Sequence, residues 1–154
     1  MTSSHAKVAL LMLSVASLFA ANGWAHSTSR PAECLALAMY WEARGEGTLG
    51  MQAVGSVVLN RVAHRKFPDS VCGVVFQGGE TPPCQFSWWC DGKSDRPANA
   101  TQWRHAVRTA EKLLANRRTD QTRGALYFHT ASVRSQWHRR QRPTVRIGNH
   151  LFYR

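Results

Sequence analysis

The sequence predicts an α+β domain, with a helical N-terminal part followed by a small C-terminal antiparallel β-sheet. Apolar residues recur at helical spacing through most of the chain. The segments ALYF and TVRIGNHLFYR near its end are instead rich in strand-forming residues. A length of 154 residues, without an internal repeat, fits a single domain.

Residues 1–25 have the layout of a secretory signal peptide. Lys7 precedes the apolar run VALLMLSVASLFAA, which is short for a membrane span, and Gly23 and Ala25 offer small residues around a cleavage point. We expect this segment to be removed, leaving residues 26–154 as the folded domain without stable membrane insertion. An uncleaved N-terminal anchor is the alternative.

The first predicted helix begins at Pro31, a residue suited to the first helical position. We expect Gly45 to end it in the left-handed conformation that often follows the last helical turn. Three residues share one face of this helix at positions i, i+4 and i+7: Leu35, Met39 and Glu42. Glu42 therefore lies on the apolar stripe, whereas Glu46 follows the glycine and is expected in a loop.

Two further helices are predicted by the same periodicity. Thr48 is the expected N-cap of a helix from Leu49 to about Arg65, and Asn99 is the expected N-cap of a helix over residues 99–118. Their apolar faces consist of Met51, Val54, Val58 and Val62 in the first helix, and Trp103, Val107, Ala110 and Leu114 in the second. Between them, SVCGVVFQ is too short for its periodicity to separate a helix from a strand.

The C-terminal strands are predicted in ALYF and on both sides of Gly148 and Asn149, a dipeptide suited to a tight hairpin turn. The segment SVRSQWHRRQRP before the hairpin is a basic loop or a short helix around Trp137.

The chain is strongly basic, with a formal net charge of +11. Such a charge favours anionic partners, among them nucleic acid, an anionic membrane surface and the bacterial cell wall. Export disfavours nucleic acid as the target, whereas peptidoglycan carries peptide carboxylates and fits both the charge and the compartment. We therefore expect a periplasmic monomer that binds peptidoglycan.

All four cysteines follow the predicted signal peptide. An even number of cysteines in an exported chain favours disulfides, with three possible pairings. We favour Cys84–Cys90, which closes a short loop, together with Cys34–Cys72. The sequence has no C-x-x-C pair and no H-E-x-x-H motif, so we expect no metal and no cofactor.

Glu42 is the first candidate for chemistry. The helix macrodipole at a C-terminus and burial among apolar groups both raise the pKa of a carboxylate. A glutamic acid that stays protonated near neutral pH can donate its proton to a glycosidic oxygen. The alternative is that Glu42 points to solvent or pairs with Arg44 or Arg61.

Glu46 has several possible roles. It could act as a second carboxylate, as in glycosidases with paired acids. It could also bind substrate hydroxyl groups or orient Arg44. A plain loop carboxylate that accepts bonds from nearby backbone N–H groups is an equally good explanation.

Aromatic residues are prominent, and several lie in the long irregular segment GGETPPCQFSWWCDGKSDRP, a type of segment that is often functional. The candidates for stacking on sugar rings are Trp41, Phe86, Trp88, Trp89, Tyr127 and Trp137. Core packing is the alternative, and it is strong for Trp41 and Tyr127. It is weaker for Trp88 and Trp89, because two adjacent tryptophans on a loop cannot easily both point inward.

Five ordered blocks resemble the cell wall hydrolase family of spore cortex-lytic enzymes and their Gram-negative relatives: YWEARGEGTLGMQAVGSVVLNRV, FPDSVCGVVFQ, CQFSWWCDG, ALYFHTASVRSQW and RIGNHLFYR. The resemblance covers roughly Glu33 to Arg154. It implies a catalytic domain similar to lytic transglycosylases and resuscitation-promoting factors. It also implies cleavage of the glycan strand between N-acetylmuramic acid and N-acetylglucosamine, with Glu42 as the catalytic acid and base.

The expected substrate-binding residues are Glu46, Arg44, Gln85, Phe86, Trp88, Trp89, Tyr127, His129 and Trp137. The chain departs from the spore enzymes in lacking a peptidoglycan-binding repeat, in its cysteine-bracketed loop, and in His129, where those enzymes tend to have Asn. These departures favour general peptidoglycan over spore cortex as the substrate. The alternatives are an N-acetylmuramoyl-L-alanine amidase and a non-catalytic peptidoglycan-binding protein.

Overall fold

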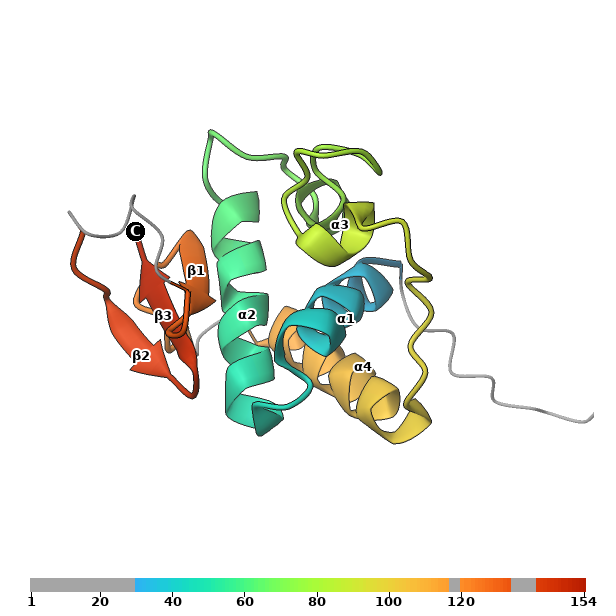
Figure 1. Cartoon of the computed structure of the whole chain (residues 1–154). Coiled ribbons are helices and arrows are strands. Elements are labelled where there is room, and N and C mark those ends of the chain that lie inside the picture. Colours follow the sequence, from blue (N-terminus) through green and yellow to red (C-terminus); the bar gives the residue numbers. More distant parts are fainter. Residues whose placement is uncertain (1–29, 117–119, 134–140) are drawn as a thin grey trace, which may run out of the picture.

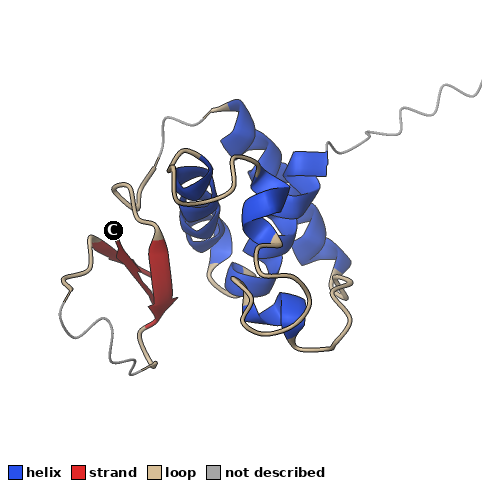
Figure 2. Cartoon of the chain, turned by 90° about the horizontal axis from the view of Figure 1, so that it is seen from above, coloured by secondary structure: helices blue, strands red, loops and turns tan. Residues whose placement is uncertain are grey.

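The computed structural model describes residues 30–116, 120–133 and 141–154 and confirms the α+β class. The predicted signal peptide and Trp137 lie outside these ranges. The helices are α1 (Arg30–Ala43), α2 (Gly47–Val62), α3 (Val71–Val75), the 3₁₀-helix η1 (Ser87–Cys90) and α4 (Ala100–Ala115), and the strands are β1 (Tyr127–Thr130), β2 (Val145–Ile147) and β3 (His150–Tyr153). The sheet packs beside α2, and α1 and α4 lie on the other side of that helix (Figures 1 and 2). Within the described ranges, no helix is both long and apolar enough to cross a membrane.

The turn between α1 and α2 differs from the prediction. Helix α1 ends at Ala43, and the left-handed glycine is Gly47, with φ 66°, rather than Gly45. Thr48 is not an N-cap, because α2 already begins at Gly47. The Oγ1 atom of Thr48 lies 3.0 Å from Nε2 of His105 on α4 instead. The chain therefore reverses within three residues, which leaves no room for the longer loop that the prediction implied.

The main core forms where α1, α2 and α4 meet. Leu35 and Met39 of α1 are fully buried, so the predicted apolar face is confirmed. Gly55 of α2 allows the close approach, since a Cβ atom there would lie 2.1 Å from Cε of Met39 and 2.8 Å from Cδ2 of Leu113. The absence of a side chain at this position thus sets the spacing of the three helices, because packed cores tolerate almost no overlap.

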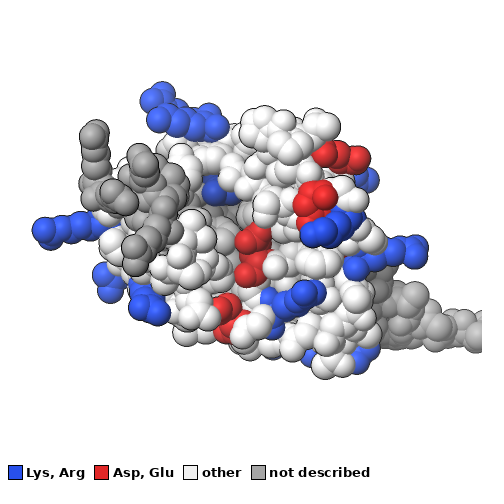
Figure 3. All heavy atoms as spheres, in the orientation of Figure 1, with Lys and Arg blue, Asp and Glu red and all other residues white. Residues whose placement is uncertain are grey.

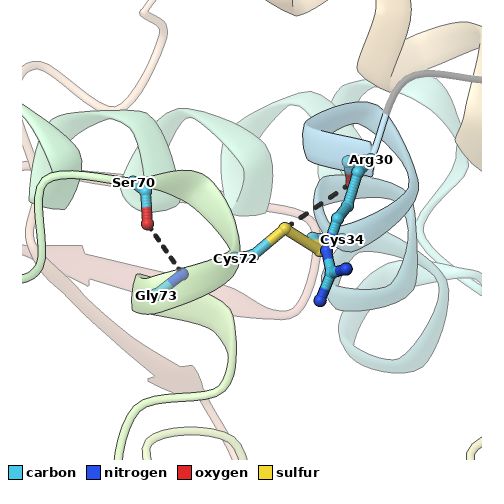
Figure 4. The surroundings of a disulfide bond; sticks show 5 residues. All are labelled: Arg30, Cys34, Ser70, Cys72 and Gly73. Atoms are coloured by element: carbon cyan, nitrogen blue, oxygen red, sulfur yellow. Dashed lines mark hydrogen bonds between the residues drawn. A yellow bond between two sulfur atoms is a disulfide. The ribbon is translucent and has the colours of Figure 1, made fainter.

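Both predicted disulfides are present. Cys34–Cys72 joins α1 to α3, and Cys84–Cys90 closes the loop that carries η1. Figure 4 shows the first bridge beside the N-cap of α3, where Oγ of Ser70 accepts a hydrogen bond from the backbone N–H of Gly73 at 3.1 Å. This cap resolves SVCGVVFQ as a short helix rather than a strand.

Helix α4 begins as predicted. The side chain of Asn99 caps it by accepting a hydrogen bond from the backbone N–H of Gln102 at 3.0 Å. The helix ends at Ala115, three residues before the predicted end. Likewise, α2 ends at Val62 instead of Arg65.

The three strands form an antiparallel sheet in the order β1-β3-β2. Gly148, with φ 55°, and Asn149 form the predicted turn between β2 and β3. Phe152 of β3 is fully buried and packs against Ala53 and Val57 of α2. The hydrophobic face of the sheet therefore fixes it to the side of α2 that faces away from α1 and α4.

Candidate active site

A cavity of about 390 Å³ lies between the end of α1, helix α2, the loop before η1 and the sheet. Its lining residues are Glu42, Arg61, Cys84, Gln85, Phe86, Ser87, Phe128, His129, Thr130, Val133 and His150. Four of the predicted site residues therefore meet in one place: Glu42, Gln85, Phe86 and His129. On the face drawn in Figure 3, basic side chains lie mostly around the edge and acidic ones lie nearer the middle.

Among the described residues that line this cavity, Glu42 is the only one with a carboxylate. It is the second-last residue of α1 and continues the face of Leu35 and Met39. Burial raises its pKa from 4.5 to about 7, while the charge of Arg61 and the nearby indole of Trp88 lower it by smaller amounts. At neutral pH a large fraction of Glu42 is therefore protonated and can act as an acid.

Arg61 is the buried cation of the site, and sequence reasoning treated it only as a possible partner for Glu42. Its side chain is 3% exposed, and its Nε donates a hydrogen bond to the carbonyl oxygen of Leu126 at 2.7 Å. Burial lowers its pKa to about 10, so the guanidinium remains charged at neutral pH. The described side chains of Glu42 and Arg61 form no ion pair within 4.0 Å. The alternative in which Glu42 is paired with Arg61 by direct contact is therefore not observed.

Glu46 lies in the turn before α2, and its carboxylate is bound by the β2–β3 hairpin. Its two oxygens accept hydrogen bonds from the backbone N–H and the side-chain amide of Asn149, each at 2.9 Å. The backbone bond is the larger cause of a lowered pKa, so Glu46 is an anion at neutral pH. Glu46 is not among the residues that line the cavity of Glu42.

Two histidines of the sheet border the cavity. Nδ1 of His129 lies 2.8 Å from the carbonyl oxygen of Thr130, so this nitrogen carries the hydrogen, and Nε2 accepts from the hydroxyl of Tyr153 at 3.0 Å. His150 is 3% exposed, and burial lowers its pKa, which keeps it neutral. Sequence reasoning missed His150, because only the fold places β3 opposite α1.

The aromatic loop is more buried than expected. Trp88 is 8% exposed and belongs to the main core, and Trp89 is half-buried with its ring 4.4 Å from that of Phe76. The expectation that two adjacent tryptophans cannot both face inward is therefore wrong, because η1 turns one onto α1 and the other onto α3. Nε1 of Trp88 is buried without a hydrogen-bond partner in the described part of the chain.

The remaining candidates are spread over the surface. Tyr127 is 40% exposed, which disagrees with the alternative of core packing, and it lines a neighbouring cavity of about 460 Å³. Arg44 is exposed and lies over the rings of Tyr40 and Trp41, at 5.0 and 5.1 Å from their centroids. Neither Arg44 nor the two tryptophans of η1 line the two cavities. Among the residues that the structure describes, no three His, Cys, Asp or Glu side chains form a group that could hold a metal ion.

A half-buried acid and a buried cation in a cleft between helices and a small sheet define the class of site. The family model described as Cell Wall Hydrolase matches residues 45–153, and the chain belongs to this family. The match begins three residues after Glu42, so the position of Glu42 in the cleft is evidence independent of the family model.

Curated relatives include spore cortex-lytic enzymes. The chain is 36% identical over 121 residues to the enzyme of Bacillus cereus and 38% identical over 119 residues to that of Bacillus subtilis strain 168. These alignments cover 78% and 77% of this chain but 42% and 35% of the relatives. The chain thus spans about two fifths of the length of these curated relatives.

Two solved structures are similar over almost their whole length. The catalytic domain of the germination-specific lytic transglycosylase SleB from Bacillus anthracis has a TM-score of 0.62 and 33% identity, covering 86% of this chain and 98% of that one. The catalytic domain of the Bacillus cereus SleB protein has a TM-score of 0.59 and 29% identity, covering 82% and 91%. The fold is therefore that of a lytic transglycosylase-like catalytic domain.

Proposed function

We propose that the protein cleaves the glycan strand of peptidoglycan between N-acetylmuramic acid and N-acetylglucosamine, as a lytic transglycosylase. The observation that carries this proposal is Glu42, a carboxylic acid with a pKa near 7 that lines a cleft between the helices and the sheet. Membership of the cell wall hydrolase family and the likeness to a lytic transglycosylase domain support it.

Glu42 would act twice in this reaction. Its carboxylic acid first donates a proton to the glycosidic oxygen as the bond to the muramic C1 breaks, and the N-acetylglucosamine end leaves with that proton. The carboxylate then accepts the proton of the muramic C6 hydroxyl, whose oxygen bonds to C1 and closes a 1,6-anhydro ring. No water is consumed and Glu42 ends protonated, so one acid is sufficient.

The surroundings of Glu42 suit this double role. Burial keeps the acid form available, whereas the charge of Arg61 and the free N–H of Trp88 favour the carboxylate that forms after proton transfer. A second carboxylate is missing from the lining of this cavity, and Glu46 is bound to Asn149. The arrangement therefore fits a one-acid mechanism better than a paired-acid one.

We further propose that residues 1–25 are a cleaved signal peptide and that residues 26–154 act as a monomeric catalytic domain in the periplasm. The apolar run after Lys7 and the two disulfides support export to an oxidising compartment. Gln85, Phe86 and His129 would contact the sugar next to Glu42, and Tyr127 would contact a neighbouring one.

Mass spectrometry of purified sacculi digested with the protein tests the reaction. We expect soluble fragments that end in 1,6-anhydro-N-acetylmuramic acid. Reducing muramic ends would instead indicate hydrolysis at the same bond. Free stem peptides would indicate an amidase, and binding to sacculi without any release would indicate a non-catalytic binding protein.

A further inference from the structure

A second cavity, of about 460 Å³, adjoins the cavity of Glu42. Its lining residues are Arg61, Gln85, Tyr127, Phe128 and Gln141. Three of these residues, Arg61, Gln85 and Phe128, also line the first cavity. The two cavities are therefore neighbouring parts of one cleft, and the side chain of Arg61 lies at their boundary.

The charge of Arg61 lacks a counter-ion within the described ranges. Arg61 is 3% exposed, no carboxylate lies within 4.0 Å of it, and its Nη1 is buried without a hydrogen-bond partner. None of the described residues that line the second cavity carries a negative charge. Glu42, the acid of the first cavity, is neutral in the form that donates its proton. The cleft that is ready for catalysis thus holds a buried cation that no described carboxylate contacts.

Burying a charge without a partner is costly, and aromatic faces offset this cost only in part. The guanidinium carbon of Arg61 lies 5.3 Å from the centroid of Phe67, 5.6 Å from Phe86 and 5.8 Å from Tyr127. These rings and the carbonyl of Leu126 orient the side chain and keep it at the boundary. A rigid, poorly compensated guanidinium beside an open cavity is well suited to bind a planar carboxylate.

We propose that the cavity of Arg61 and Tyr127 is a subsite for a carboxylate carried by the N-acetylmuramic acid residue of the substrate. The inference rests on the proposed function and adds the recognition of one substituent to it. The carboxylate could come from the stem peptide or, on a strand without peptide, from the lactyl group. A subsite of this kind would select the muramic sugar and so fix which glycosidic bond lies at Glu42.

The test compares three soluble substrates that differ in the carboxylates they carry. These are glycan strands with stem peptides, the same strands after enzymatic removal of the peptides, and the peptide-bearing strands with their carboxylates converted to amides. The variants are Arg61→Met and Arg61→Lys. Arg108→Met is the matched control, because Arg108 is exposed on α4 and its loss changes the net charge equally.

For Arg61→Met, we expect KM on peptide-bearing strands to rise about tenfold or more, because a ground-state contact is lost. Any fall in kcat that comes from the lost charge near Glu42 should be the same on all three substrates. Arg61→Lys should recover part of this loss, and Arg108→Met should change KM little. The amidated strands should show a high KM with the wild type and no further rise in Arg61→Met. If stripped strands, whose lactyl carboxylate is free, behave like peptide-bearing strands, the subsite accepts either carboxylate; if they behave like amidated strands, it accepts only that of the peptide.

An equal loss of kcat on all three substrates without a selective rise in KM on peptide-bearing strands would overturn the proposal and show that Arg61 acts only through Glu42. If Arg61→Met fails to fold, the wild type decides, since an unchanged KM on amidated strands also overturns the subsite. Binding of the strands to Glu42→Gln, measured by calorimetry, separates the subsite from catalysis. Weaker binding of amidated strands would support the subsite even if the wild type released no anhydro products.

Discussion

The two glutamates at either end of the α1–α2 turn are four residues apart, yet their environments have opposite effects. Glu42 ends an apolar helix face, and burial raises its pKa to about 7. Glu46 faces the hairpin, and two hydrogen bonds from Asn149 lower its pKa. The same side chain is thus largely able to hold a proton near neutral pH in one place and is a fixed anion in the other.

The two environments suit two different roles, which are proton transfer for Glu42 and positioning of the hairpin for Glu46. A group that must exchange a proton near neutral pH has to be poorly solvated and free of strong donors, which describes Glu42. A group that connects two elements does so best as a charged acceptor of good donors, which describes Glu46. Breaking each environment in turn measures how far the two roles are independent.

The largest expected effect is that of Glu42→Gln on activity. The amide cannot donate a proton to the glycosidic oxygen, so we expect kcat/KM on sacculi to fall by about 10²- to 10⁴-fold. Release of anhydro-muropeptides measures this change. Glu33→Gln is the control, because Glu33 is exposed at the other end of the same helix. Near wild-type activity in Glu42→Gln would remove Glu42 from the mechanism.

The same substitution should stabilise the protein at alkaline pH. The folded-state pKa of about 7 lies above the ordinary 4.5, so the folded state holds this proton between the two values and wild-type stability declines as the pH rises through that window. Glu42→Gln lacks this decline. It should exceed the wild type by about 3 kcal/mol at pH 8.5 and match it near pH 4, because one pKa unit is about 1.4 kcal/mol.

Urea unfolding of both proteins across this pH range measures the difference. Because only the difference between the two proteins is compared, titration of the other groups cancels to first order. A constant difference from pH 4 to pH 8.5 would show that Glu42 has an ordinary pKa, and the electrostatic contrast between the two glutamates would then disappear.

Sequence reasoning identified Glu42 but overlooked the equivalent signal in α2. Val54, Val58 and Arg61 stand at i, i+4 and i+7, the same spacing as Leu35, Met39 and Glu42. Basic residues are common in the last turn of a helix, where they face the macrodipole, so this position alone does not distinguish Arg61 from a surface residue. In both helices, the position of a charged residue on the apolar face indicated a site residue more clearly than its place in the last turn did.

The apolar face of α1, the two C-terminal strands and the hairpin turn were predictable, because each depends on local spacing. The buried face of α4 was predicted only in part, since Ala106, Thr109 and Leu113 are buried rather than Trp103, Val107 and Leu114. The contacts of Glu46 with Asn149 and the position of His150 were not, because they join segments about a hundred residues apart. Local patterns carry no information on such pairings. The inward position of Trp88 likewise depends on η1, and a helix of four residues is too short to be recognised by its periodicity.

Gly148→Ala should weaken the hairpin contact. A Cβ atom at Gly148 would lie 1.9 Å from Oε2 of Glu46, and the φ of 55° is unfavourable for alanine. We expect a loss of about 2 kcal/mol in the free energy of unfolding. Gly92→Ala is the matched control, since Gly92 has φ 72° but open space around its Cβ position. Equal losses in the two variants would show that the contact with Glu46 adds nothing to the backbone strain.

The smallest expected effect is that of Glu46→Gln. The amide retains one acceptor for Asn149 but turns an NH₂ group towards the second donor, so we expect a loss of about 1 kcal/mol in stability. Activity should fall only a few-fold, because the hairpin that carries His150 is held less firmly while Glu42 is untouched. Muropeptide release and urea unfolding measure the two effects on the same protein.

A double-mutant cycle with Asn149→Ala tests whether the loss acts through the hairpin. If Glu46 serves only to hold Asn149, the two substitutions should be non-additive in both stability and activity, and the double variant should resemble the more affected single one. Additive effects would mean that Glu46 acts on something other than Asn149. Complete loss of activity in a folded Glu46→Gln protein would restore a two-carboxylate mechanism, in which the anion four residues from Glu42 takes part in the chemistry itself.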